Sequence, residues 1–448
     1  MMKLRRNFTL SIILGCAIAF GTAGCTSDAG ESGQGTGANY GTTGVSQERQ
    51  TELIPESMMH PAPTTQKGTG ARDNAKDDAE DKSGLEVRVT PGTAETTPSA
   101  PEMVKSDAPP ETAKAGPQKE RRKDVKGVYV SAYALQGKKW NAILKLLEDT
   151  ELNALVIDVK NDNGRVTYPS GVRTAKEIEA DGKPRVKDMT AFLKPLKEKN
   201  TYLIGRIVTF KDPYLAAKKP EWAMKRKDGT VWRDKRGVSW VDPYNEEVWA
   251  YNIQLAEEAI RAGFDEIQFD YVRFPEQTKA IDREVVFHNP YNENKDQIIQ
   301  RFLRTASNRI HQAGGLTSAD VFGLTTTTKN GMGIGQKWEL LTQEVDALSP
   351  MIYPSHYGAG SYGAKHPDLQ PYRIVKAATR DAIRRNAAMQ KNGEPTADIR
   401  PWLQDFTAKW IRPHQTYRKQ QIREQIKALE EQGITQYLLW NPSSRYSM

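Results

Sequence analysis

The chain has 448 residues, a length that allows two or three ordinary domains or one large domain with additional segments. Its net charge of +8 is compatible with attraction to anionic wall polymers or lipid headgroups, but no motif for nucleic-acid binding accompanies it. Residues 26–124 contain almost no apolar runs, whereas the rest of the chain has the composition of a folded domain. We therefore predict one folded part and no nucleic-acid partner.

The N-terminus resembles an export signal. A basic stretch precedes the apolar residues 8–20, which are too few to span a bilayer comfortably. The tetrapeptide that ends at Cys25 is similar to the lipobox of bacterial lipoproteins, in which the cysteine is lipidated and becomes the first mature residue. Thr22 stands where leucine is usual, so ordinary signal-peptide cleavage is the alternative. We predict that residues 1–24 are a lipoprotein-type signal peptide and that Cys25 anchors the exported chain to the bacterial membrane, facing the outside or the periplasm.

Residues 25–124 are predicted to be a disordered tether. They are rich in Gly, Ser, Thr, Pro, Ala and charged residues, and they lack the periodicity of a helix or a strand. Such a segment cannot bury enough apolar surface to offset its chain entropy. Because Cys16 and Cys25 are the only cysteines, cleavage before Cys25 leaves no intramolecular disulfide and no cysteine-based metal site. The exported domain must therefore be held together by its own core.

Residues 125–448 are predicted to form a single (β/α)8 barrel, because apolar β-branched runs alternate with helical patterns. The predicted strands are residues 127–133, 154–159, 202–208, 266–273, 316–322, 347–353, 399–404 and 436–440. The predicted helices include residues 139–149, 186–199, 246–262, 296–313, 371–388 and 416–432. Eight strands fit a closed barrel better than an open sheet. The absence of a glycine-rich phosphate sequence after the first strand argues against a dinucleotide-binding fold.

The chemistry of such a barrel is expected at the carboxyl ends of its strands, where several carboxylates converge. Asp270 lies within an otherwise apolar strand, where an ionised group is costly unless it is paired or used. Cleavage of a glycosidic bond requires one carboxylic acid and a second carboxylate that serves as nucleophile or base. We predict Asp270 and Asp320 as the catalytic pair. Alternatively, Asp270 forms a structural salt bridge with Arg206 or Arg273, and Asp320 faces the lumen only if the strand register directs it there.

Further polar and aromatic residues at the same rim are predicted to bind substrate. Asp158 and Asp405 are equally compatible with structural hydrogen bonding. The predicted substrate-binding residues are Asp158, Lys160, Arg206, Trp232, Trp240, Arg273, Tyr353, His356, Asp405 and Trp440.

Several segments together resemble the bacterial glycosyl hydrolase barrel family of unassigned function. The resemblance is carried by residues 241–245 and 263–275, by the opening strands, and by residues 349–354 and 400–406, and it spans essentially all of 125–448. It implies a TIM barrel distantly similar to α-amylase-like glycosidases. In those relatives an aspartate at the end of strand four is the nucleophile and an acid follows on strand five, which are the places of Asp270 and Asp320. The α-amylases have glutamate at the second place.

An insertion between the third strand and its helix, residues 211–245, carries Trp222, Trp232, Trp240 and Tyr244. A hairpin turn is expected at residues 227–230. Exposed aromatic faces would stack on sugar rings and form a binding surface. The alternative is that these aromatic residues cap the barrel as a small core.

We predict no metal and no cofactor. The six histidines lack ligand spacing, and the oxygen-rich run 158–163 fits a turn better than a hard-cation site. A serine-nucleophile elbow is also missing from the sequence. The predicted function is a surface-tethered glycoside hydrolase that acts on a cell-wall or extracellular polysaccharide. The alternatives are a non-catalytic carbohydrate- or wall-binding lipoprotein and a carbohydrate deacetylase, which would require a metal site.

Overall fold

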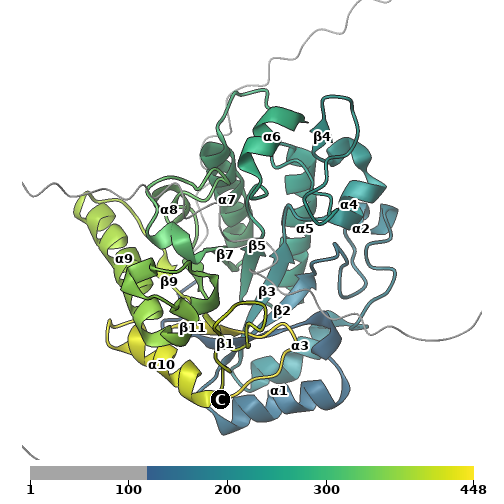
Figure 1. The fold of residues 1–448 in the computed structure, drawn as a ribbon. Coiled ribbons are helices and arrows are strands. Elements are labelled where there is room, and N and C mark those ends of the chain that lie inside the picture. The colour runs from purple at the N-terminus through teal and green to yellow at the C-terminus, as the bar shows by residue number, and fades with distance from the viewer. Residues whose placement is uncertain (1–118) are drawn as a thin grey trace, which may run out of the picture. The chain divides into compact units, whose positions relative to one another are not determined.

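The computed structural model describes residues 119–448, which form a closed barrel of parallel strands (Figure 1). Seven of the eight barrel positions are occupied by the single strands β1 (Lys126–Val130), β2 (Ala154–Lys160), β3 (Tyr202–Val208), β5 (Glu266–Asp270), β7 (Leu316–Phe322), β8 (Ala347–Ile352) and β11 (Tyr437–Trp440). The eighth consists of β9 (Asp398–Ile399) and β10 (Trp402–Gln404), which pair with β8 on either side of Pro401, a residue without a backbone N–H. The pairings β1–β11 and β8–β10 close the sheet, so the predicted (β/α)8 fold is confirmed.

Helices surround the strands (Figure 1). The six long ones match the predicted helices to within a few residues and are α1 (Gly137–Asp149), α3 (Met189–Glu198), α5 (Glu246–Ala262), α7 (Lys295–Gln312), α9 (Pro371–Lys391) and α10 (Lys419–Glu430). Shorter helices are α2 (Arg173–Glu177), α4 (Pro213–Lys218), α6 (Thr278–Glu284) and α8 (Trp338–Leu341). Single 3-10 turns are η3 (Ala132–Ala134), η4 (Pro220–Trp222), η5 (Gly323–Thr326), η6 (Pro354–His356), η7 (Ser361–Gly363) and η8 (Pro367–Leu369). Within residues 119–448, none of the helices is long and apolar enough to cross a membrane.

Local sequence sets the bounds of these helices, as α5 illustrates. The Asn245 side chain accepts a hydrogen bond from the backbone N–H of Glu247 and caps the first turn. Gly263 ends the helix at a φ of 120°, in a region of backbone conformation that residues with a Cβ rarely adopt. The helix therefore occupies the residues that the sequence predicts.

The last residues of the predicted tether, 119–124, pair with the folded part, which corrects the expectation that the disordered segment extends to residue 124. Lys119 pairs with Asp265, Arg121 with Asp346, and Lys123 with Asp398, at 2.8, 3.1 and 2.8 Å. These three aspartates lie at or just before the first residues of β5, β8 and β9. The chain therefore enters the fold at the amino-terminal rim of the barrel. The predicted signal peptide, Cys25 and the rest of the tether lie outside the described residues.

The predicted insertion forms a hairpin. Arg226 donates its backbone N–H to Thr230 at 2.8 Å, and Lys225 bridges Val231, so the expected turn at residues 227–230 is confirmed. The strand β4 (Lys225–Arg226) also pairs antiparallel with β6 (Val285–Val286), which lies in the loop after β5. The loops after β3 and β5 are thereby joined at the carboxyl-terminal mouth of the barrel.

The lumen of the barrel holds polar residues in pairs. Glu266 of β5 accepts hydrogen bonds from Arg400 at 2.7 and 2.9 Å and from Tyr202 at 2.9 Å, and all three side chains are buried. Arg400 lies between β9 and β10, and neither of these strands neighbours β5 in the sheet. The Glu266–Arg400 pair therefore crosses the interior of the barrel. Glu266 begins β5 and Asp270 ends it. The Glu266–Arg400 pair therefore lies below the residues at the mouth.

Candidate active site

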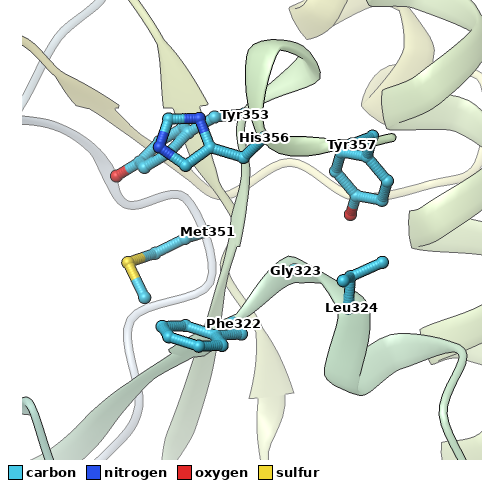
Figure 2. A pocket seen from close by; sticks show the side chains of 7 residues that line it. All are labelled: Phe322, Gly323, Leu324, Met351, Tyr353, His356 and Tyr357. Atoms are coloured by element: carbon cyan, nitrogen blue, oxygen red, sulfur yellow. The ribbon is translucent and has the colours of Figure 1, made fainter. Parts of the chain in front are cut away.

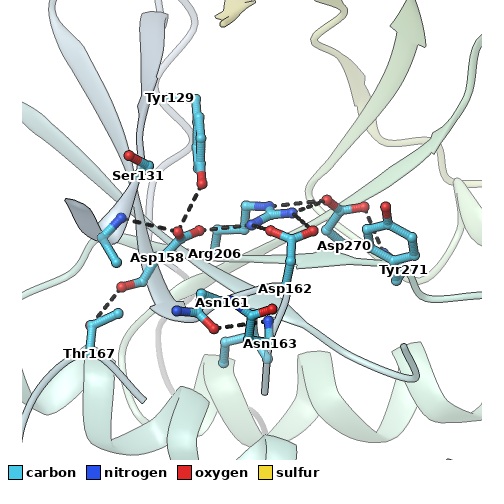
Figure 3. Close-up of polar contacts among 12 residues, drawn as sticks. Tyr129, Ser131, Asp158, Asn161, Asp162, Asn163, Thr167, Arg206, Asp270 and Tyr271 are labelled. Carbon is cyan, nitrogen blue, oxygen red and sulfur yellow. Dashed lines mark hydrogen bonds and ion pairs between the residues drawn. The ribbon is translucent and has the colours of Figure 1, made fainter. Parts of the chain in front are cut away.

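Arg206 of β3 is the centre of a carboxylate cluster at the mouth. Its side chain is fully buried, and its N–H groups point to carboxylates from β2, β5 and the loop after β2 (Figure 3). Nη1 donates to Asp158 Oδ1 at 2.8 Å and to Asp162 Oδ2 at 3.1 Å. Nη2 and Nε donate to Asp270 Oδ2 at 2.6 and 3.0 Å. These bonds orient the carboxylates around Arg206. The salt bridge between Asp270 and Arg206, which the sequence predicts as an alternative, is present, and contact of Arg206 with substrate stays a prediction.

Two stacked rings complete this cluster. The rings of Tyr129 and Trp440 lie 4.2 Å apart at 20°, and the Arg206 guanidinium lies 5.3 Å from each ring centroid. The Tyr129 hydroxyl donates to Asp158 Oδ2 at 2.8 Å. Sequence reasoning identified Trp440 but missed Tyr129. The signal was available, because Tyr129 occupies an alternate, inward position of the first strand.

Asp270 is held by three N–H donors. Besides the two bonds from Arg206, its Oδ1 accepts the backbone N–H of Tyr271 at 2.6 Å. Tyr271 has a φ of 50°, a left-handed conformation that costs free energy for a residue with a bulky side chain. The three hydrogen bonds therefore hold the Asp270 carboxyl group in one orientation, buried to all but 2% of its surface.

Asp320 of β7 lies in the same lumen in a different environment. Its Oδ1 accepts the indole N–H of Trp402 at 2.6 Å, from β10, which does not neighbour β7. Burial, and then the negative charge of Asp270, raise the pKa of Asp320 well above its usual range. A carboxyl group of raised pKa beside a stabilised carboxylate is the arrangement that divides acid and base roles between two aspartates. Asp320 is thus suited to donate a proton.

Asp158 and Asp162 complete the anionic side of the cluster. Burial raises the pKa of Asp158 to about 6, although Arg206 opposes the shift. Asp162 is 36% exposed and faces the mouth. In the same run, Asn161 accepts the backbone N–H groups of Asn163 and Arg165 at 3.0 and 3.1 Å, as expected for a turn. Within residues 119–448, no group of three or more His, Cys, Asp or Glu side chains is arranged to hold a metal ion.

Tyr353 and His356, two predicted substrate-binding residues, line one small pocket (Figure 2). Its volume is about 10 Å³, the lower limit for one water molecule. The Tyr353 hydroxyl is buried and has no hydrogen-bond partner within residues 119–448. Burial, and then the charges of Asp320 and Asp270, raise the pKa of Tyr353. His356 is oriented by Ser355, whose Oγ lies 2.9 Å from Nδ1.

Two predicted substrate-binding cations lie elsewhere. Lys160 is fully buried, pairs with Asp212 at 2.6 Å and lies 5.2 Å from the ring of Tyr251 in α5. A register irregularity between Asp158 and Lys160 turns the lysine toward the helical layer, away from the lumen. Arg273 lies 4.4 Å from the ring of Phe322 among aromatic rings and donates to the Phe274 carbonyl at 3.0 Å. Both cations therefore have partners within the protein, and their contact with substrate stays a prediction.

The tryptophans of the insertion do not form the expected exposed surface. Trp232 is 2% exposed and Trp240 is fully buried, with its indole N–H donated to Asp234 at 3.1 Å. Trp240 packs edge-on against Tyr271 at 5.9 Å, directly behind the residue that follows Asp270. The alternative of a small core above the barrel therefore describes these two residues, and it supports the strained backbone at Tyr271.

Asp405, after β10, lies outside the Arg206 cluster. Its Oδ2 accepts the backbone N–H of Ser447 at 2.9 Å, and burial raises its pKa to about 7. The neighbouring Tyr446 donates its hydroxyl to the carbonyl of Tyr129 in β1. Residues 446–447 therefore lie across the mouth between β1 and β10. Asp270 and Asp320 are each only 2% exposed, so other residues cover both carboxyl groups.

Comparison of the sequence with known proteins finds a matching family and several similar structures. Residues 127–446 match the family described as "Putative glycosyl hydrolase domain". A hypothetical protein of Ruminiclostridium thermocellum is 36% identical, over 46% of this chain and 98% of its own, with a TM-score of 0.39. The PgaB (BpsB) glycoside hydrolase domain of Bordetella bronchiseptica is 14% identical, over 71% of this chain and 94% of its own, with a TM-score of 0.48.

The spore cortex-lytic enzyme SleL of Bacillus cereus is 12% identical, over 74% of this chain and 73% of its own, with a TM-score of 0.42. None of the curated proteins compared with the chain matches its sequence.

Proposed function

Because this chain belongs to the glycosyl hydrolase domain family that its residues 127–446 match, we propose that it hydrolyses glycosidic bonds with Asp270 and Asp320. One observation carries the proposal. A carboxylate held by Arg206 and a backbone amide shares the lumen with a carboxyl group whose pKa is raised by burial and by that same carboxylate. This is the pair of protonation states that glycoside hydrolysis requires.

In the proposed reaction, the carboxyl group of Asp320 gives its proton to the glycosidic oxygen as the bond from that oxygen to the anomeric carbon breaks. Asp270 either attacks the anomeric carbon or takes a proton from the water that attacks it. A carboxyl separation of about 5–5.5 Å corresponds to attack and retention of configuration, and about 6.5–9.5 Å corresponds to water and inversion. Arg206 keeps Asp270 oriented, and in the proposed complex the Tyr353 hydroxyl, which lacks a partner within residues 119–448, binds a sugar oxygen.

The proposed substrate is a cell-wall or extracellular polysaccharide, and the proposed anchor is a lipid on Cys25. The described part of the chain begins at the amino-terminal rim, where Lys119 pairs with Asp265, at the other end of β5 from Asp270.

The hydrolase proposal is tested by incubating the full chain with purified peptidoglycan, chitosan, soluble chitin oligosaccharides and α-glucans. Reducing-end release is measured together with mass spectrometry of the products. The variants are Asp270→Asn and Asp320→Asn, and Asp398→Asn at the opposite rim is the control. We expect product from the wild-type chain and the control and a large loss in both mouth variants. Release at the wild-type rate from Asp270→Asn would refute the mechanism, and binding without release by every variant would favour the non-catalytic alternative.

The anchor is tested separately by expressing the full chain and Cys25→Ala in a bacterial host supplied with labelled palmitate. We expect label and membrane association for the wild-type chain only. Unlabelled wild-type chain in the soluble extracytoplasmic fraction would favour ordinary signal-peptide cleavage.

A further inference from the structure

A row of aromatic rings leads from the small pocket that Tyr353 lines to the surface. Tyr353 packs edge-on against Phe406 with ring centroids 5.6 Å apart. Phe406 in turn stacks on Trp410, with centroids 6.0 Å apart and the planes only 18° from parallel. Both Phe406 and Trp410 follow β10 at the carboxyl-terminal mouth. The row therefore begins at that pocket and ends outside it.

The outer end of this row is open to solvent. Phe406 is 8% exposed, whereas Trp410 is 38% exposed and is one of few large apolar side chains so exposed within residues 119–448. One face of the indole packs on Phe406, so that ring and its loop hold it in a fixed orientation. An immobilised flat ring with an open face suits the apolar face of a pyranose ring.

The residues that flank Trp410 are cationic. Lys409 and Arg412 are both exposed, and in the described part of the chain neither pairs with a carboxylate. Arg412 Nη1 donates to the carbonyl of Ile411 at 2.9 Å, which holds the guanidinium next to the indole-bearing turn. Two unpaired cations beside an open aromatic ring favour an anionic ligand.

We propose that Trp410 forms an outer subsite that stacks one pyranose ring of an acidic polysaccharide, with Lys409 and Arg412 binding the carboxylate of that chain. The proposal rests on the proposed function and names its substrate class. The negative charge of the carboxylate cluster at the mouth explains why the acidic group of the polysaccharide binds near Trp410, away from the cleaved bond. The inner cluster places Asp158, Asp162 and Asp270 around a single guanidinium, so a second anion there would be repelled.

The subsite is tested by affinity electrophoresis of the full chain in native gels that contain carboxymethylcellulose or hydroxyethylcellulose, two polymers with one backbone and different charge. Hyaluronan serves as a second acidic polymer. We expect stronger retardation by the carboxylated polymers than by the neutral one. Trp410→Ala should weaken retardation by about three- to tenfold, and Trp410→Tyr should restore much of it. The double variant Lys409→Ala/Arg412→Ala should lose the preference for charged polymers.

Tyr291→Ala is the matched control, because Tyr291 is an exposed aromatic residue outside the row, at 64% exposure. Circular dichroism establishes that each variant is folded. Unchanged retardation of Trp410→Ala, equal retardation by charged and neutral cellulose, or no retardation by either acidic polymer would overturn the subsite. Retardation requires no bond cleavage, so a chain that binds through Trp410 without releasing reducing ends would refute the hydrolase proposal and leave this one standing.

Discussion

Replacing Arg206 by methionine isolates the energetic role of the cluster at the mouth. The substitution keeps an apolar stem of similar length but removes the cation that binds Asp158 and Asp270 at 2.8 and 2.6 Å. These two carboxylates are 1% and 2% exposed, so water cannot replace the lost guanidinium. Asp162, at 36% exposure, can be solvated instead. The variant therefore leaves two buried anions without their partner.

Removal of one partner from a buried ion pair typically costs about 3–5 kcal/mol of unfolding free energy. The pKa of Asp158 is already about 6 instead of 3.8, so ionised Asp158 destabilises the folded state by ~3 kcal/mol at neutral pH. Since this folded-state pKa is raised, the stability linked to Asp158 is fully present below about pH 4 and is lost as the pH rises through about 6. Without Arg206 the pKa rises further, so the loss should be larger at pH 8 than at pH 5.

The assay is urea unfolding of the full chain at both pH values, followed by tryptophan fluorescence. Arg173→Met is the control, because Arg173 is 89% exposed and its pair with Glu177 is surrounded by solvent, so its removal should leave stability nearly unchanged. A loss below about 1 kcal/mol for Arg206→Met at pH 8 would contradict the buried-pair argument. Equal losses at pH 5 and pH 8 would contradict the linkage to Asp158.

Three further predictions concern the chemistry. Asp320→Asn should remove the basic limb of the pH–rate profile and lower turnover of substrates with poor leaving groups by about 10²–10⁴-fold, and an unchanged profile would exclude Asp320 as the acid. Trp402→Phe removes a hydrogen bond that lowers the pKa of Asp320, so the basic limb should move to higher pH; movement to lower pH would contradict this. Tyr353→Phe should reduce kcat/KM about tenfold, the value of one hydrogen bond to substrate, while unfolding free energy stays unchanged, because the hydroxyl bonds to nothing within residues 119–448. A loss of stability above about 1 kcal/mol would show that it is structural.

The sequence by itself determined the barrel. A strand buried on both faces, such as β2, begins as the continuous apolar run 154–157, and helix ends follow from local caps such as Asn245 and Gly263. These signals depend on near neighbours in the chain, so they are readable without coordinates. The order of the strands placed Asp270 and Asp320 at one rim, but whether Asp320 faces the lumen stayed open until its contact with Trp402 was known.

Only the tertiary structure decided which side chains meet. Contacts such as Trp402 with Asp320 join strands that are not neighbours, so no local pattern encodes them. A single irregularity in β2 turned Lys160 away from the site that Asp158 enters. Burial, too, is a property of the assembled fold, which is why Trp240 became core while Trp410 remained open. The two-residue alternation of a strand assigns each side chain to one of its two faces. Closure of the barrel and the packing of its loops determine what each face contacts.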